Sequence, residues 1–230
     1  MKIAFQMDPI EAVNIEADST FRLAEEAQAR GHSLFYYPPD TLAYQNGRIT
    51  ARGYPMIVQR VAGAHVDFGP EQEAELAKFD VVWLRQDPPF DMHYITTTHI
   101  LDRLKGQTLV VNDPFWVRNY PEKLLVLDFP DLTPPTAIAR DLEILKAFRQ
   151  APGDVILKPL YGNGGAGVFL LKEDDRNMTS LHELFSGFSR EPLIVQKFLP
   201  DVSKGDKRVI LVDGEPCLLY TSPSPRDRIA

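Results

Sequence analysis

The sequence has very little cysteine: Cys217 is the single one among 230 residues. One thiol cannot form a disulfide within the chain, and it cannot supply the groups of cysteines that bind zinc or iron–sulfur clusters. Internal disulfides and cysteine-based metal clusters are therefore excluded. A chain of 230 residues is long enough for one large or two modest domains with packed cores.

The sequence also lacks an excess of positive charge and any long apolar run. It has 25 Lys and Arg against 32 Asp and Glu, so a net charge of −7 gives no electrostatic basis for binding nucleic acid or an anionic membrane. No apolar run approaches the ~20 residues that span a bilayer. Asp8 and Pro9 interrupt the start of the chain, where a secretory signal needs apolar residues. We therefore expect a cytoplasmic protein.

The first half of the chain alternates between strand-like and helix-like segments. Strands are predicted at Lys2–Gln6 and Ser33–Tyr37, on either side of a helix that begins near Asp18 and ends at Gly31. Further elements are predicted as a hairpin turn at 46–47, a short helix at 71–78, and strands at 80–85 and 108–111. This alternation predicts an α/β, Rossmann-like domain with a parallel sheet that binds ligands at its carboxyl edge.

The second half changes character after Asn112-Asp-Pro114. Its predicted elements are helices at 141–150 and 178–188 and strands at 154–159, 168–172, 192–198 and 206–212. We expect an N-terminal domain over residues 1–118 and a second domain over residues 119–217.

The C-terminal segment has a biased composition. Asp213-Gly214 predicts a hairpin turn, which needs a return strand of alternating apolar residues. From Leu218 onward the chain instead contains prolines and serines that a central strand does not accommodate. We therefore expect residues 218–230 to be a non-native or disordered tail, and the strand at 206–212 to lack a return partner.

A glycine-rich segment, Gly162-Asn-Gly-Gly-Ala-Gly167, matches the pattern G-x-G-x-x-G by letter. A Rossmann loop requires a helix directly after the last glycine, but the apolar run at 168–172 is typical of a strand. No Gly-Lys-Ser/Thr follows, which excludes a Walker A loop. A glycine turn between two antiparallel strands can expose backbone N–H groups to a phosphate. The alternative is a flexible hairpin without a ligand.

Lys158 favours the phosphate-binding interpretation. It ends the strand before the glycine segment, so its ammonium group can reach a phosphate held there. A lysine at a strand end is more often a solvated surface residue. A lysine, a proline and four glycines within the ten residues from Lys158 to Gly167 are a much less common combination.

These residues carry a family resemblance. Together with Glu122-Lys-Leu124 and Val195-Gln-Lys-Phe-Leu-Pro200, the segment around Lys158 resembles the ATP-grasp fold. More narrowly, residues 1–216 resemble bacterial glutathione synthetases in four segments: Met7-Asp-Pro-Ile10, Arg85-Gln-Asp-Pro-Pro-Phe-Asp91, Leu157-Lys-Pro-Leu-Tyr-Gly-Asn-Gly-Gly165, and Gly205-Asp-Lys-Arg-Val with Val212-Asp-Gly-Glu-Pro216. The resemblance implies a Rossmann-like pre-ATP-grasp domain of the α/β class followed by an incomplete ATP-grasp domain of the α+β class.

The resemblance also implies an ATP site in the second half. Lys123 and Lys158 would contact the phosphates, and Gly164 and Gly165 would close over them as a lid. Arg208 would point toward the transferred phosphoryl group or its acceptor carboxylate. Arg208 and Lys158 are therefore the implied catalytic residues. The alternative for Arg208 is an ion pair with a surface carboxylate.

The nucleoside would bind at the end of a strand. By the same resemblance, backbone groups of Gln196, Lys197, Phe198 and Leu199 would hold the adenine, and Asp206 would bind the ribose hydroxyls. The alternative for Asp206 is that its side chain caps a turn.

A proline-stiffened loop at the carboxyl end of the strand at 80–85 carries Arg85, Asp87 and Asp91. That edge of an α/β sheet is where ligands bind, and an arginine suits bidentate recognition of a carboxylate. The resemblance assigns this face to the dipeptide substrate, with Asn14 and Ser19 as weaker candidates. The alternative is a rigid turn without a ligand.

The implied reaction is the ATP-dependent ligation of γ-glutamylcysteine and glycine through an acyl phosphate, with Mg²⁺ as cofactor and a homotetramer as assembly. The metal ligands would lie beyond the matching segments, because Asp213 and Glu215 are poor candidates in a hairpin turn. We therefore expect this chain to be an inactive fragment without its metal site. Two alternatives stay open: another ATP-grasp ligase of the D-alanine–D-alanine or glutamate-adding type, and a non-catalytic nucleotide-binding module.

Overall fold

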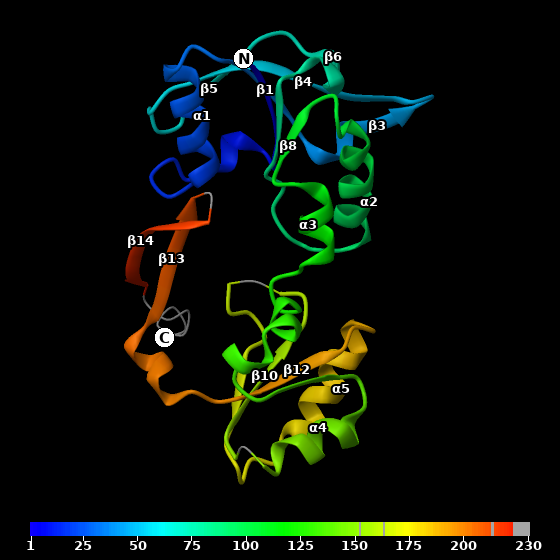
Figure 1. Ribbon diagram of the computed structural model, residues 1–230, viewed down its shortest axis with the longest axis vertical. Coiled ribbons are helices and arrows are strands. Elements are labelled where there is room, and N and C mark those ends of the chain that lie inside the picture. The colour runs from blue at the N-terminus through cyan, green and yellow to red at the C-terminus, as the bar shows by residue number, and fades with distance from the viewer. Residues whose placement is uncertain (152, 163, 213, 223–230) are drawn as a thin grey trace. The chain divides into compact units, whose positions relative to one another are not determined.

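A computed structural model describes residues 1–151, 153–162, 164–212 and 214–222. The chain divides into two compact units, Met1–Pro121 and Glu122–Ala230 (Figure 1). The first unit has a sheet with parallel central strands and the second an antiparallel sheet, so the predicted α/β and α+β classes are confirmed.

The parallel strands of the first unit lie at the centre of its sheet. β1 (Lys2–Gln6) pairs with β2 (Ser33–Tyr37) on one side and with β7 (Val81–Leu84) on the other. β8 (Leu109–Val111) continues the sheet beyond β7. All three pairings are parallel, so the carboxyl ends of β1 and β7 meet at one edge of the sheet.

Antiparallel strands extend this sheet beyond β2. They are β3 (Leu42–Gln45), β4 (Arg48–Val58), β5 (Val66–Phe68) and β6 (Gln72–Glu75). β4 pairs with all of the other three and with β2. The predicted turn joins β3 to β4: Asn46 (φ 50°) and Gly47 (φ 86°) both adopt the left-handed conformation that a two-residue hairpin loop requires.

The helix predicted at 71–78 is wrong. Residues Gln72–Glu75 form β6, and only Leu76–Lys78 form a short 3-10 helix. β6 pairs with residues 50–53 of β4. The backbone hydrogen bonds to that neighbouring strand outweigh the local helix propensity of the alanine, leucine and glutamate residues in this segment.

Helices cover both faces of the sheet (Figure 1). α1 (Ser19–Ala29) packs on the face that carries Ile3 and Phe5 of β1. α2 (Met92–Leu101) packs on the opposite face, which carries Ala4. Successive residues of a strand point to opposite faces, so a strand buried on both sides must be apolar almost throughout.

The other helices of both units, apart from two in the second unit, are short. They are α3 (Pro114–Asn119) and 3-10 segments at Ile10–Ala12, Pro39–Thr41, Leu76–Lys78, Asp102–Leu104, Leu125–Asp128, Pro130–Leu132 and Pro200–Lys204. Within the described part of the chain, no helix combines the length and the apolar character that crossing a membrane requires.

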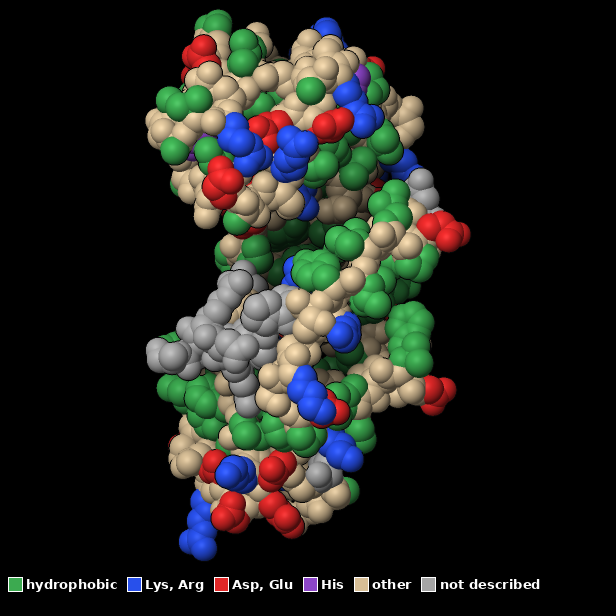
Figure 2. Space-filling model, turned by 90° about the vertical axis from the view of Figure 1, so that its left-hand side faces the viewer, with side chains coloured by type: hydrophobic (Ala, Val, Ile, Leu, Met, Phe, Trp, Pro, Cys, Tyr) green, Lys and Arg blue, Asp and Glu red, His purple; other side chains and the backbone are tan. Residues whose placement is uncertain are grey.

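The solvent-facing side of α1 carries charges of both signs. Arg22 and Arg30 form ion pairs with Glu25 and Glu26, and Arg60 approaches Glu25 to 2.6 Å. On the face seen in Figure 2, Lys and Arg side chains of this unit lie beside Asp and Glu side chains. Exposed pairs of this kind add little stability, but they keep this face free of a patch of one charge.

The second unit contains a four-stranded antiparallel sheet in the order β11-β10-β12-β9. Its strands are β9 (Thr136–Ala139), β10 (Val155–Pro159), β11 (Phe169–Leu171) and β12 (Leu193–Lys197). α4 (Leu142–Arg149) and α5 (Met178–Phe188) cover one face, where Leu145 and Met178 pack against Leu157. The opposite face of this sheet therefore carries the alternate residues of each strand.

A two-stranded sheet of β13 (Asp206–Val212) and β14 (Glu215–Ser222) completes the described chain. The expectation that β13 lacks a return partner is wrong, because residues 218–222 belong to β14. These residues, Leu-Leu-Tyr-Thr-Ser, are mostly of the apolar, aromatic or β-branched types that suit strands. Asp213 and Pro223, on which the expectation rested, lie outside the described residues.

Gly53 of β4 lies directly against the backbone of β2. A Cβ atom at this position would lie 2.1 Å from Tyr36 O and 2.8 Å from Tyr37 Cβ. We expect Gly53→Ala to lower the free energy of unfolding of the first unit by about 3 kcal/mol, the upper end of the usual cost of overpacking. Trp83 and Trp116 are the two tryptophans and both lie in this unit, so urea unfolding followed by tryptophan fluorescence reports on it.

Gly187→Ala is the matched control for that substitution. Gly187 lies in α5 of the second unit, and a Cβ atom there would meet nothing within 4 Å. This change adds helix propensity without a clash and should leave the tryptophan transition unchanged. If Gly53→Ala unfolded at the same urea concentration as the unmodified chain, the close packing of β4 against β2 would be refuted.

Candidate functional site

The glycine segment lies where the sequence predicts it, between the antiparallel strands β10 and β11. Gly164, Gly165 and Gly167 have φ values of 60°, 79° and 71°, and Asn163 lies outside the described residues. Other residue types adopt this left-handed conformation only at a cost. The glycine loop, residues 160–168, thus needs glycine at these three positions for the path of its backbone.

Contacts hold both ends of the glycine loop. At the first end, Lys123 Nζ donates hydrogen bonds to Pro159 O at 2.8 Å and to Gly162 O at 2.9 Å. At the second end, a Cβ atom on Gly167 would lie 3.2 Å from Pro159 Cδ, whereas a Cβ atom on Gly164 would meet nothing within 4 Å. The loop is fixed at its ends and open at its tip, which allows a ligand to approach the backbone there.

Lys158 lies on the sheet face opposite α4 and α5. Because strand residues alternate between faces, Leu157 points into the core and Lys158 points away from it. Lys158 Nζ donates to Gln196 Oε1 at 3.2 Å, and Gln196 Nε2 donates to Thr136 Oγ1 at 2.8 Å. This row of side chains crosses β10, β12 and β9 and fixes the position of the ammonium group.

Lys123 and Lys158 share one electrostatic environment. Burial lowers the pKa of Lys158, and burial followed by the positive charge of Lys158 lowers the pKa of Lys123. The Glu122 carboxylate acts on both in the opposite direction. Neither lysine forms a salt bridge with a described residue. Two partly buried ammonium groups without a bonded carboxylate form a site that an anion would stabilise.

The predicted adenine-binding segment lies at the end of β12. Gln196 and Lys197 are the last residues of this strand, and Phe198 and Leu199 follow it. The N–H groups of Lys197 and Phe198 donate to backbone carbonyl groups at 2.9 Å. The Leu199 N–H has no hydrogen-bond partner among the described residues, and it is therefore available to a ligand.

Asp206 and Arg208 lie on β13, outside the four-stranded sheet. Both residues are exposed. In the part of the chain that the structure describes, no hydrogen bond or ion pair joins either of them to Lys123 or Lys158. The structure does not bring them together with the lysines, and their roles at the ribose and the transferred phosphoryl group stay predictions.

In the first unit, Arg85 follows β7 at the carboxyl edge of the sheet. Its backbone N–H donates to Gln6 O at 2.8 Å and so continues the pairing with β1. Its guanidinium group donates from Nε to Thr20 Oγ1 at 2.9 Å and from Nη2 to Ser19 Oγ at 3.0 Å. These hydroxyl groups lie in the first turn of α1 and hold the guanidinium group in one orientation.

Arg85 lines a cavity of about 300 Å³. The residues around this edge cavity are Met7, Asp8, Pro9, Ala12, Val13, Asn14, Asp18, Thr20, Arg85 and Asp87. The predicted residues Asn14, Arg85 and Asp87 thus come together, and Ser19 contacts Arg85. Asp91 is not part of the lining: its Oδ1 accepts a hydrogen bond from a backbone N–H at 3.0 Å and caps α2.

Three polar residues of the edge cavity, Asp8, Asp18 and Thr20, were not among the predicted site residues. Asp8 Oδ2 accepts a hydrogen bond from Asp87 N at 2.6 Å, and Asp18 caps α1. The position of Asp8 could have been predicted from the sequence. β1 and β7 were both predicted as strands of one parallel sheet, and the carboxyl ends of parallel strands lie at the same edge. Asp8 and Asp87, which follow these strands, are therefore expected at that edge.

The edge cavity contains more negative than positive charge. Burial raises the pKa of the Asp87 carboxyl group, and the charges of Asp8 and Asp18 raise it further. The positive charge of Arg85 acts in the opposite direction. Three carboxylates therefore line this cavity beside one guanidinium group.

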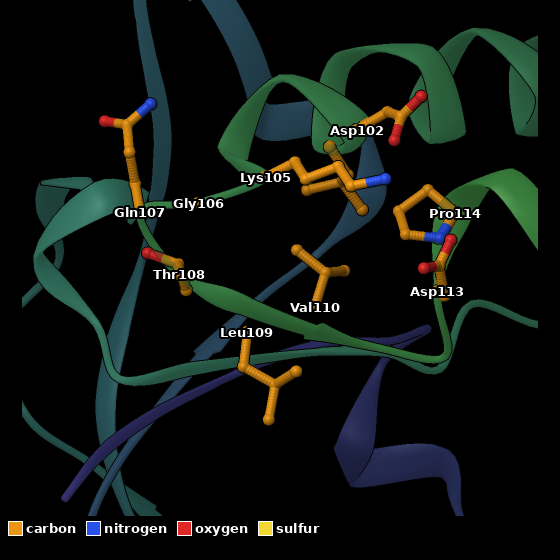
Figure 3. A pocket seen from close by; sticks show the side chains of 10 residues that line it. Asp102, Lys105, Gly106, Gln107, Thr108, Leu109, Val110, Asp113 and Pro114 are labelled. Carbon is orange, nitrogen blue, oxygen red and sulfur yellow. The ribbon is translucent and has the colours of Figure 1, made fainter.

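A larger cavity, of about 420 Å³, contains none of the predicted site residues (Figure 3). It is lined by Leu101, Asp102, Lys105, Gly106, Gln107, Thr108, Leu109, Val110, Asp113 and Pro114. Several of its polar groups are used in the fold. Asp102 forms a 2.7 Å ion pair with Arg118, Asp113 caps α3, and Thr108 Oγ1 donates to two backbone carbonyl groups. We therefore place the candidate substrate site at the smaller cavity.

The described residues do not fit a Mg²⁺ site. No three His, Cys, Asp or Glu side chains among them are arranged to hold a metal ion. Glu215 lies in β14, and Asp213 is outside the described part of the chain. We therefore assign no step of the chemistry to a metal.

Solved structures share the fold of this chain. A RimK domain protein of the ATP-grasp type from Sphaerobacter thermophilus matches with a TM-score of 0.59 and 20% identity, over 92% of this chain and 69% of that one. The D-cycloserine synthetase DcsG matches with a TM-score of 0.64 and 12% identity, over 97% of this chain and 68% of that one. At such identities the likeness concerns the fold alone.

Curated relatives are much more similar in sequence. A glutathione synthetase of Brucella melitensis biotype 1 is 56% identical over 228 residues, which are 99% of this chain and 73% of the relative. A glutathione synthetase of Mesorhizobium japonicum is 56% identical over 216 residues, which are 94% of this chain and 69% of the relative.

Two family models match consecutive parts of the sequence. The model of the prokaryotic glutathione synthetase N-terminal domain matches residues 1–118. The model of the prokaryotic glutathione synthetase ATP-grasp domain matches residues 122–227. With two domain models in the same order and relatives of 56% identity, this chain belongs to the prokaryotic glutathione synthetase family.

Proposed function

We propose that this chain supplies the dipeptide-binding and ATP-binding domains of a glutathione synthetase, an ATP-dependent carboxylate–amine ligase. The substrates are γ-glutamylcysteine, glycine and ATP. Three observations support this: the family to which the chain belongs, the edge cavity beside Arg85 in the first unit, and the lysine pair at the glycine loop in the second.

The reaction has two steps. An oxygen of the cysteinyl carboxylate attacks the γ-phosphorus of ATP, the bond from that phosphorus to the β,γ-bridging oxygen breaks, and ADP leaves. The amine of glycine then attacks the carbonyl carbon of the resulting acyl phosphate. The bond between that carbon and the phosphate oxygen breaks, inorganic phosphate leaves, and the nitrogen loses a proton as the amide forms.

Phosphoryl transfer asks a protein mainly for positioning and for positive charge around the phosphate oxygens. Lys123 uses two of its three N–H donors on the carbonyl groups of Pro159 and Gly162, so its main task is to hold the glycine loop. Lys158 uses one donor on Gln196 and has two left for phosphate oxygens. Backbone N–H groups at the tip of the loop add further donors.

The observation that carries the proposal is the lysine pair itself. Lys123 and Lys158 are partly buried, their pKa values are lowered, and no described carboxylate forms a salt bridge with them. Such an arrangement is unfavourable without an anion and favourable with one.

Calorimetric titration of the chain with ATP and with γ-glutamylcysteine tests the proposal. We expect each ligand to bind, and ATP to bind also when the dipeptide site is saturated, because the two ligands are assigned to different units. An ATP-grasp ligase of another specificity, or a nucleotide-binding module, would bind ATP but not the dipeptide. Failure of γ-glutamylcysteine to bind would therefore refute the proposed substrate.

Lys158→Ala should weaken ATP binding and leave dipeptide binding unchanged. Removing one charge-assisted contact to a phosphate is expected to lose about 1.5–3 kcal/mol, roughly a 10- to 150-fold rise in Kd. Lys146→Ala on α4 is the control, because the Lys146 side chain is partly exposed and its ammonium group pairs with Glu143 in the same helix. An ATP Kd equal to that of the Lys146 control would make Lys158 an ordinary surface lysine.

Arg85→Lys should weaken dipeptide binding and leave ATP binding unchanged. Lysine keeps the charge but loses the planar fork, so a bidentate contact to a carboxylate fails. We expect the Kd for γ-glutamylcysteine to rise about tenfold or more. Arg30→Lys is the matched control, because Arg30 directly follows α1, is exposed and pairs with Glu26. Equal losses for both ligands would indicate damage to the fold and would contradict the assignment of Arg85 to the dipeptide.

A further inference from the structure

The edge cavity has charged side chains of both signs that form no salt bridge with one another. Asp8, Asp18 and Asp87 line it together with Arg85. Among the described residues, none of these four side chains takes part in a salt bridge. The guanidinium group of Arg85 instead donates to two hydroxyl groups of α1.

Each carboxylate in the edge cavity keeps at least one oxygen for a ligand. Asp8 uses Oδ2 to accept a hydrogen bond from Asp87 N at 2.6 Å, and Asp18 uses Oδ1 to accept one from Phe21 N at 2.6 Å. The Asp87 carboxylate accepts no hydrogen bond from a described residue. On the other side, Arg85 Nη1 has no partner in the described part of the chain.

We propose that the edge cavity binds the α-amino-acid end of the dipeptide as a zwitterion, with its α-carboxylate against Arg85 and its α-ammonium group against Asp87 and Asp8. The identity of the ligand rests on the proposed function. The proposal fixes which end of γ-glutamylcysteine enters this cavity: the glutamyl end, and not the cysteinyl carboxylate that is phosphorylated.

The charges explain why a zwitterion fits better than simpler ligands. A dicarboxylate would bring a second anion toward three carboxylates, and a plain amine would leave the guanidinium group without an anion. A cation beside Asp87 would also offset the burial and the neighbouring negative charges that raise the pKa of this carboxyl group. Both contacts would be charge-assisted hydrogen bonds, which are stronger than neutral ones.

The size of the edge cavity agrees with one amino-acid-sized group. Its volume of about 300 Å³ lies at the lower end of the range for small-molecule sites. That space accommodates the glutamyl part of the dipeptide. The cysteinyl part would then extend out of the cavity, away from the cluster of Asp8, Asp18 and Asp87.

Two analogues separate the charged contacts. Glutaryl-cysteine has the carboxylate but lacks the α-amino group, and 4-aminobutyryl-cysteine has the amino group but lacks the α-carboxylate. Calorimetry with the unmodified chain should give each analogue a Kd about 10- to 100-fold above that of γ-glutamylcysteine, the loss typical of one hydrogen bond between charged groups.

Substitutions in the chain should mirror the analogues. Asp87→Asn keeps the shape of the side chain and should weaken γ-glutamylcysteine about 10-fold or more, with little effect on glutaryl-cysteine. Arg85→Lys should weaken γ-glutamylcysteine and glutaryl-cysteine but not 4-aminobutyryl-cysteine. Asp8→Asn is a second variant of the ammonium contact, since its amide oxygen can still accept from Asp87 N. Asp67→Asn is the control, because Asp67 is the exposed residue of β5.

The pattern across ligands decides between the outcomes. The zwitterion proposal is overturned if Asp87→Asn and Asp8→Asn weaken the binding of γ-glutamylcysteine and of glutaryl-cysteine equally. It is also overturned if glutaryl-cysteine binds the unmodified chain as tightly as γ-glutamylcysteine does.

Titration with free L-glutamate, and with glutarate and 4-aminobutyrate as its analogues, tests the zwitterion site separately from the proposed dipeptide substrate. If the chain binds L-glutamate with this pattern but not the dipeptide, the zwitterion site stands and the proposed substrate fails. If neither γ-glutamylcysteine nor L-glutamate binds, the zwitterion site fails too.

Discussion

The second unit depends on how two partly buried ammonium groups are accommodated. Lys123 gains two backbone carbonyl groups as acceptors, and these carbonyl groups belong to the start of the glycine loop. Lys158 gains the amide oxygen of Gln196, which is itself oriented by Thr136. Hydrogen bonds of this kind reduce the cost of burying a charge but do not cancel the charge. The same contacts therefore shape the loop and leave a positive site beside it, ready for an anion.

The first unit presents the opposite electrostatic situation, at the carboxyl edge of its parallel strands. Parallel strands end at one edge, and the residues that follow β1 and β7 bring Asp8 and Asp87 together with Arg85. The hydroxyl groups of the first turn of α1 hold the guanidinium group without neutralising it. In both units the apolar residues of the strands form the core. The candidate site residue either alternates with them along the strand, as Lys158 does in β10, or follows the strand, as Arg85 follows β7.

Local signals predicted much of this arrangement. The apolar runs of β1, β2 and β7 identify strands because a sheet covered on both faces needs them. The glycine loop is recognisable because its backbone needs positive φ angles that only glycine adopts without strain. Lys158 is adjacent to this loop in the sequence, so its place in the site could be expected as well.

Long-range contacts account for what the sequence did not reveal. Lys123 reaches Gly162 over 39 residues, and Asp87 reaches Asp8 over 79 residues. The strand β6 forms where a helix was predicted, because β4 offers it backbone partners. Likewise β14 pairs with β13 although prolines and serines follow it closely in the sequence. In each case a partner distant in the sequence outweighs the preference of the local segment.

Proton uptake on ATP binding measures the state of the two lysines directly. In the free protein their pKa values are lowered, whereas a bound triphosphate favours the charged form and raises them again. Calorimetry in buffers of different ionisation enthalpy should therefore show no uptake by the lysines below their lowered pKa values, where they are protonated in both states. Uptake should increase as the pH rises through those values. Above about pH 8 the phosphate groups are already fully ionised and take up no protons of their own. Lys158→Ala should reduce the uptake. ATP binding with no proton uptake across the alkaline range, or with an uptake that Lys158→Ala leaves unchanged, would contradict the assignment of these lysines to the phosphates.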